Sequence, residues 1–280
     1  MNRKSLILAL VVAGLFGTVR GSFAGQALPT RSIANVTGNL YRAQNNTHFT
    51  VFLVTAEGII VSDPINRDFA TWLKSELDER FGLPVRYLLY SHSDADHASG
   101  GDVFADTSVF IGHENMRDGL PDSVHPPTEF YSDRHRVTLG GKSVEMIHPG
   151  PAHSANMSIL RFPDENAIFV VDFVSIKRLP FRNLSGYDLE VWLSEMRTVE
   201  AFGADIVIPG HGQVGTTADV VDHRHYVEEL RDAVADGIAA GRSLAELQGS
   251  ITLEGYRDWA SFDAWREANI EGMYGMLTGP

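Results

Sequence analysis

The chain has 280 residues, of which 44% are hydrophobic, and it carries a formal net charge of −13 with no cysteine. This length and composition predict one large folded domain and exclude a disordered chain. The negative charge argues against nucleic acid as a partner, and the absence of cysteine excludes thiolate metal sites and cysteine nucleophiles.

The first 24 residues have the pattern of a secretory signal peptide. Two basic residues, Arg3 and Lys4, precede an apolar stretch over residues 6–16, and small residues up to Ala24 then provide a cleavage site. The apolar stretch is too short for a spanning helix, which favours a cleaved signal peptide. An uncleaved membrane anchor is the alternative interpretation. We therefore expect a periplasmic or secreted protein whose mature domain, residues 25–280, does not contact a membrane after cleavage.

The predicted elements begin with strands and then alternate between strands and helices. Residues 49–64 have the pattern of a hairpin, and residues 67–82 have helical spacing that ends at Gly82. Short apolar runs predict strands over 85–91, 108–112, 143–148, 157–162, 166–173 and 205–210, and helices over 187–203, 218–240 and 244–248, before an aromatic-rich tail. This order predicts an αββα sandwich of the α/β class with a C-terminal helical extension, although periodicity alone also allows a doubly wound sheet.

Ionisable side chains follow the ends of several predicted strands. Seven nitrogen and oxygen donors with no sulfur suit one or two divalent metal ions, and the rim of a sheet can hold such a set rigidly. The seven donors are His92, Asp94, Asp96, His97, His153, Asp172 and His211.

Five short motifs in this order resemble the metallo-β-lactamase superfamily: "VSDP" with Asp63, "HSDADH", "GPAHS", "VVDF" and "PGHG". The resemblance extends over residues 36–225. It implies the αββα fold and one or two metals held by a His-x-His-x-Asp-His motif, a further His, a bridging Asp and a last His.

Asp94 departs from the family pattern because it stands where the second His of that motif would be. Carried over residue by residue, the first metal would have His92, Asp94 and His153. The second metal would have Asp96, His97 and His211, and Asp172 would bridge the two. We expect two divalent ions with zinc as the first choice, while the extra carboxylate leaves iron or manganese open and could weaken the first site.

The resemblance implies an exported metal-dependent hydrolase. Metal-bound hydroxide would attack a small ester, lactone, thioester or amide, β-lactams included, and Asp96 would also orient the nucleophile and transfer its proton. Two alternatives stay open: a non-haem iron oxidoreductase on the same fold, and a non-catalytic metal-binding relative.

Three cations after Asp172 predict recognition of an anionic group on a small-molecule substrate: Lys177, Arg178 and Arg182. Local balance of acidic neighbours is the alternative interpretation. The tail could pack into the core or form a homo-oligomer surface. The other seven histidines are predicted to be ordinary surface or hydrogen-bonded groups: His48, His113, His125, His135, His148, His223 and His225.

Overall fold

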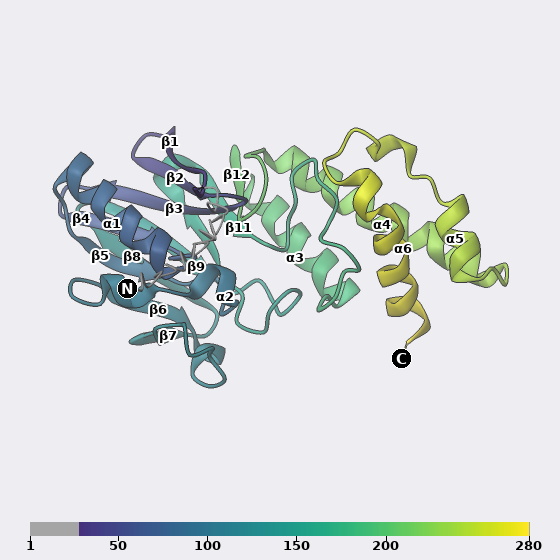
Figure 1. Ribbon diagram of the computed structural model, residues 1–280, viewed down its shortest axis with the longest axis horizontal. Helices are drawn as coiled ribbons and strands as arrows, with labels where there is room; N and C mark the ends of the chain where they lie inside the picture. Colours follow the sequence, from purple (N-terminus) through teal and green to yellow (C-terminus); the bar gives the residue numbers. More distant parts are fainter. Residues whose placement is uncertain (1–27, 280) are drawn as a thin grey trace, which may run out of the picture.

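Two β-sheets pack face to face in the computed structural model, which describes residues 28–279 (Figure 1). The predicted signal peptide, residues 1–24, lies outside the described residues. The first sheet contains β1 (Arg31–Thr37), β2 (Leu40–Asn45), β3 (His48–Thr55), β4 (Gly58–Ser62), β5 (Val85–Leu89), β6 (Val109–His113) and β7 (Glu129–Tyr131). These strands lie side by side in chain order. Strands β1 to β4 pair antiparallel and β4 to β7 pair parallel, so the sheet is mixed.

The second sheet contains β8 (Arg134–Leu139), β9 (Lys142–Ile147), β10 (Ile159–Phe162), β11 (Ala167–Val171) and β12 (Ile206–Pro209). Its spatial order is β12-β11-β10-β9-β8. Strands β8 to β11 pair antiparallel, while β12 runs parallel to β11. Because β11 and β12 are parallel, the residues that follow them leave the sheet at the same edge.

Helices cover the outer face of each sheet. The α-helices are α1 (Arg67–Phe81), α2 (Ala95–Ala98), α3 (Leu189–Phe202), α4 (Thr217–Ala239), α5 (Leu244–Ser250) and α6 (Phe262–Thr278), and short 3-10 turns occupy Gly101–Phe104, Glu114–Met116, Pro163–Glu165 and Glu254–Tyr256. Helix α1 begins where the Asn66 side chain accepts a hydrogen bond from the Phe69 N–H, and it ends at Gly82 with a left-handed φ of 62°. Within the described residues, no helix is both long and apolar enough to cross a membrane.

Three hydrophobic layers hold the sandwich together. Leu53 of the first sheet and Phe169 of the second are fully buried in one cluster between the two sheets. Leu73 of α1 packs in a second cluster with the outer face of the first sheet, and Trp192 of α3 packs in a third with the second sheet. This arrangement confirms the predicted αββα architecture.

The C-terminal helices extend the helical layer of the second sheet. Figure 1 shows α4, α5 and α6 gathered at the end of the molecule away from β1 to β7. In α6, Ile270 and Met273 are fully buried in the same cluster as α3, and the Asn269 amide donates to the Pro180 carbonyl at 3.0 Å. The tail therefore packs on the core and also fixes the loop that follows Asp172.

Candidate metal centre

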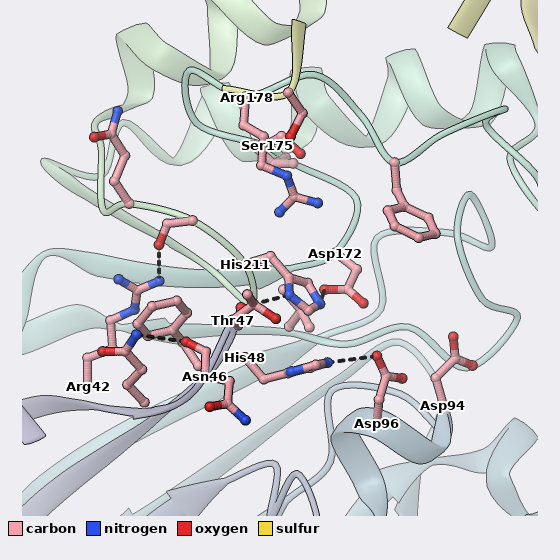
Figure 2. Close-up of a pocket in the computed structure, with 18 of the residues that line it drawn as sticks. Arg42, Asn46, Thr47, His48, Asp94, Asp96, Asp172, Ser175, Arg178 and His211 are labelled. Carbon is pink, nitrogen blue, oxygen red and sulfur yellow. Dashed lines mark hydrogen bonds and ion pairs between the residues drawn. The ribbon is translucent and has the colours of Figure 1, made fainter. Parts of the chain in front are cut away.

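The structure brings the seven predicted donors together at one edge of the sandwich. His92 follows β5, His153 lies in the loop after β9, Asp172 follows β11 and His211 follows β12. Six of the seven donors, together with His48, form two groups with ligand atoms within 4.8 Å of one another: His92, Asp94 and His153, and His48, Asp96, His97 and His211. Asp172 lies between them, and Figure 2 shows it beside His211.

The first group has both imidazole Nε2 atoms close to one carboxylate oxygen. Asp94 Oδ2 lies 3.6 Å from His92 Nε2 and 3.4 Å from His153 Nε2. The Ser91 hydroxyl donates to Asp63 and lies 2.8 Å from His92 Nδ1, so this ring nitrogen is the donor. The buried Nε2 of His92 therefore presents a lone pair to Asp94, without a hydrogen-bond partner in residues 28–279.

The second group contains two imidazoles whose Nε2 atoms lie only 3.2 Å apart, those of His97 and His211. His211 Nδ1 donates to the Thr47 carbonyl at 2.9 Å, and His97 Nδ1 faces Asp63 Oδ2 at 3.4 Å. Both Nε2 atoms therefore carry lone pairs that point at each other unless a proton or a cation lies between them. This geometry fits a metal ion.

Asp172 connects the two groups. Its Oδ2 lies 3.6 Å from His92 Nε2 and 3.3 Å from His97 Nε2, and its Oδ1 lies 3.4 Å from His211 Nε2. The preceding Val171 has a φ of +53°, which is strained for a β-branched residue, and this turn aims Asp172 into the cluster.

Gly210 lies directly under the cluster. A Cβ at this position would come within 2.8 Å of Asp172 Oδ1 and 2.9 Å of His97 Cε1. Only glycine leaves room for both side chains at this approach.

The electrostatics of the metal-free cluster favour a proton on His97. Burial alone would lower the pKa of His97, but Asp172 and Asp63 outweigh it and raise the pKa to about 9. Burial lowers the pKa of His211 to about 4. Burial also opposes ionisation of Asp172, yet the surrounding imidazoles, with His97 the strongest, hold the pKa of its carboxyl well below the usual range. A metal ion would replace the proton on His97, so metal binding would release protons.

Asp63 orients the cluster from behind. It is fully buried and accepts hydrogen bonds from the Ser91 N–H at 2.8 Å and the Ser91 hydroxyl at 2.6 Å. Its second oxygen also faces His97 Nδ1. Such carboxylates fix the tautomer and orientation of a ligating histidine.

Two residues that position the second group, His48 and Arg42, were not predicted from the sequence. His48 Nε2 lies 3.1 Å from Asp96 Oδ2, and Figure 2 shows the two side chains pointing at each other. Arg42 stacks over the Phe49 ring and donates to the carbonyls of Pro209 and Gly212, at 3.2 and 2.6 Å. In the sequence, His48 is marked only by its position directly before the predicted hairpin at residues 49–64. That position does not indicate which loop the hairpin would contact.

A cavity of about 990 Å³ opens onto the cluster. Of the three predicted cations, only Arg178 lines it, pointing toward His211 in Figure 2. Lys177 lies 3.5 Å from Asp219, and Arg182 stacks over the Phe181 ring at 4.8 Å, so neither lines the cavity. Of the three cations predicted to bind the substrate, only Arg178 is therefore positioned to do so.

Arg178 reaches the cavity with a free guanidinium. Its charge centre lies 4.9 Å from the ring centroid of Trp265, and within residues 28–279 it forms no ion pair. Burial lowers the pKa of the guanidinium, and the nearby Asp172 opposes this shift. Phe181 and Trp265 supply an apolar wall on the same side. The cavity thus combines a metal-ligand cluster with one cation and aromatic surface.

The Metallo-beta-lactamase superfamily model matches residues 66–211, which is more than half of the chain. The chain belongs to this superfamily. The matched range begins at α1 and ends at His211, and it therefore includes all seven predicted donors.

Two characterised relatives align with parts of the chain. The alpha subunit of a 2,4-dinitroanisole O-demethylase from Nocardioides sp. (strain JS1661) is 24% identical over 194 residues, which cover 65% of this chain and 58% of the relative. A linear primary-alkylsulfatase from Pseudomonas sp. (strain ATCC 19151) is 28% identical over 145 residues, covering 47% of this chain and 26% of the relative. The chain thus spans less than two thirds of the length of either relative.

Solved structures share the fold at low sequence identity. A metallo-beta-lactamase from Pontibacter korlensis covers 71% of this chain and 99% of its own, with a TM-score of 0.64 and 17% identity. An inverting sec-alkylsulfatase from Pseudomonas sp. covers 89% of this chain and 50% of its own, with a TM-score of 0.73 and 14% identity. These similarities establish the fold of the chain.

Proposed function

We propose that the protein is a metal-dependent hydrolase that cleaves a small ester carrying an anionic group, with lactones, thioesters and amides as related substrates. One observation carries the proposal: the unpaired Arg178 guanidinium and the carboxylate–imidazole cluster face the same cavity. A half-buried cation without a carboxylate partner is costly to maintain, which favours an anionic ligand as its partner.

The metal cluster and Asp96 would together provide the nucleophile. Zinc or a similar divalent ion, when bound by the cluster, supplies hydroxide at neutral pH and stabilises developing negative charge. Asp96 lies at the cavity, and its hydrogen bond with His48 lowers the pKa of its carboxyl, so it is ionised. An ionised carboxylate in this position accepts a hydrogen bond from a water molecule and can take its proton.

Arg178 and the aromatic wall would orient the substrate. The guanidinium suits bidentate contact with a carboxylate or sulfate. Phe181 and Trp265 beside it suit an apolar portion of the same molecule. The names of the two relatives, an alkylsulfatase and an O-demethylase subunit, support substrates with a cleavable bond at an ester or ether oxygen.

A matched pair of arginine variants tests this function. The zinc-loaded protein is assayed on pairs of aryl and alkyl esters, including sulfate esters, that differ only in one anionic group. We expect Arg178→Met to lower kcat/KM about 10- to 100-fold on the anionic member of a pair and little on the neutral one. The control Arg134→Met, at an exposed position outside the cavity, keeps wild-type values. Equal losses on both members would contradict anion recognition, and absence of turnover on every pair would contradict the hydrolase.

Export is a separate part of the proposal, because it depends on residues 1–24. Cell fractionation with N-terminal sequencing is expected to find the protein in the periplasm or medium with processing after Ala24. An unprocessed N-terminus in the cytoplasm would contradict it.

A second candidate is a non-haem iron oxidoreductase. The group of His92, His153 and Asp94 has the two-histidine, one-carboxylate composition typical of such iron sites. Oxygen consumption by iron-loaded protein, without hydrolysis by the zinc form, would favour this candidate. Stoichiometric metal binding without turnover by either form would instead indicate a non-catalytic metal-binding protein.

A further inference from the structure

His48 lies inside the second ligand group although it belongs to none of the motifs that define the metal cluster. It is the first residue of β3, and its ring centroid lies 4.6 Å from that of His211 and 5.7 Å from that of His97. One ligand atom from each of these rings and from Asp96 lies within 4.8 Å of the others. The side chain is thus as close to this centre as the motif residues are.

The distances match those between two ligands of one ion. Donor atoms at roughly 2.0–2.2 Å from a divalent metal are separated by about 2.8–3.6 Å in octahedral or tetrahedral geometry. His48 Nε2 and Asp96 Oδ2 are 3.1 Å apart, and His97 Nε2 and His211 Nε2 are 3.2 Å apart. Each pair can form one edge of a common coordination shell.

The backbone on both sides of His48 is fixed to the loop that carries His211. The Thr47 carbonyl accepts the His211 Nδ1 hydrogen bond, and the Phe49 N–H donates to the Gly210 carbonyl at 2.8 Å. Arg42 on the paired strand adds two more bonds to the same loop. His48 therefore moves as one unit with His211, which preorganises the two rings with respect to each other.

We propose that His48 is a metal ligand, so that the second site holds its ion with Asp96, the shared Asp172 and three histidines: His48, His97 and His211. The site would then be richer in nitrogen than the first site, where Asp94 takes the place of a histidine. A nitrogen-rich site favours zinc and other borderline metals over manganese and magnesium. This assignment rests on metal binding by the cluster and not on the hydrolytic reaction.

Cadmium NMR distinguishes a ligand from an outer hydrogen-bond partner. The metal-stripped protein is loaded with two equivalents of ¹¹³Cd²⁺, whose resonance moves to lower frequency when an oxygen ligand replaces a nitrogen ligand. His48→Gln is the test variant, because the glutamine amide can still donate to Asp96 but provides no nitrogen ligand. His225→Gln, on the exposed face of α4, is the matched control. Asp94→His assigns the first-site resonance by moving it.

The expected result is that His48→Gln moves only the second-site resonance to lower frequency and weakens one Cd²⁺ affinity at least about tenfold in calorimetric titration. His225→Gln leaves both resonances and both affinities unchanged. Circular dichroism of the metal-free forms shows whether both variants are folded, and His48→Asn replaces His48→Gln if the latter is not. Wild-type values in the folded His48 variant would overturn the proposal while leaving the metal centre intact. Failure of the wild-type protein to bind Cd²⁺ would overturn both.

Discussion

In the second ligand group, His211 Nδ1 donates to the Thr47 carbonyl, and His97 Nδ1 lies 3.4 Å from Asp63 Oδ2, an ion-pair distance without a hydrogen bond. In the first group, His92 has such a partner in Ser91, but the buried His153 Nδ1 has none among the described residues. The carboxylates of the two groups are similarly exposed, with relative accessibilities of 50% for Asp94 and 56% for Asp96.

This comparison indicates unequal metal sites. Partners behind a ligating histidine fix its tautomer and orientation, and losing them typically costs 10- to 100-fold in metal affinity. The histidines of the second site are therefore better preorganised than those of the first, where His153 Nδ1 lacks such a partner within residues 28–279. We expect the second site to fill first.

Removing the residue that both sites share has the largest expected effect. Asp172→Ala deletes the carboxylate that contacts His92, His97 and His211, so both sites lose a ligand. Bound zinc is expected to fall below one per chain, and kcat/KM by about 10³-fold or more. Elemental analysis and the ester assay measure both. Asp258→Ala, at an exposed position, is the control, and two bound zinc ions in Asp172→Ala would refute the bridging assignment.

Weakening the support of the second site comes next. Asp63→Asn keeps the size of the side chain but removes the negative charge beside His97 Nδ1. The tighter zinc affinity is expected to fall about 10- to 100-fold in competition with a chelating dye, and the weaker one to change less, because Asp63 reaches His92 only through the Ser91 hydroxyl. If Asp63→Asn lowers only the weaker zinc affinity, the second site is not the better preorganised one, which would contradict this account.

The first site is supported by a carboxyl group that resists ionisation. Glu195 is fully buried and accepts the Ala152 N–H beside His153, and burial raises its pKa to about 7. Because the folded state holds this proton more tightly than the unfolded chain, ionisation destabilises the fold as the pH rises from about 4.5 through 7.

Between pH 5 and pH 8, the wild-type free energy of unfolding should therefore fall by about 2 kcal/mol more than that of Glu195→Gln. Urea unfolding of both proteins with a chelator present measures the difference. Parallel pH profiles would show that Glu195 is ionised across this range.

Restoring a histidine in the first site has the smallest expected effect. Asp94→His replaces an exposed carboxylate by an imidazole near His92 and His153. We expect the weaker zinc affinity to rise about tenfold while the tighter one stays within twofold, as measured by calorimetry. A change confined to the tighter affinity would place Asp94 in the other site.

The sequence predicted those parts of the fold that have strong apolar runs. Segments such as 85–91 and 166–173 formed buried strands, and their ends brought His92 and Asp172 together. Strands β1, β2, β7 and β8 were missed, because segments such as "RSIANVT" and "LYRAQN" mix polar and apolar residues. Three of these strands, β1, β7 and β8, lie at sheet edges, and β2 lies beside β1. Edge strands take their pairing from neighbours and not from their own periodicity.

The missed site residues depend on contacts between distant segments. Arg42 of β2 donates to the Gly212 carbonyl, which lies 170 residues later in the sequence. The paired strand β3 places His48 beside Asp96. Lys177 and Arg178 are adjacent in sequence, yet they face different surroundings because Lys177 has a φ of +47°. No periodic pattern could distinguish the two.

Zinc titration of the metal-stripped protein and of Asp94→Ala, with elemental analysis of the product, tests the inequality of the two sites most directly. We predict two zinc ions in the wild type, bound in a tight and a weak step, and loss of only the weak step in Asp94→Ala. Loss of the tight step in that variant, or the absence of stoichiometric zinc in the wild type, would contradict this assignment.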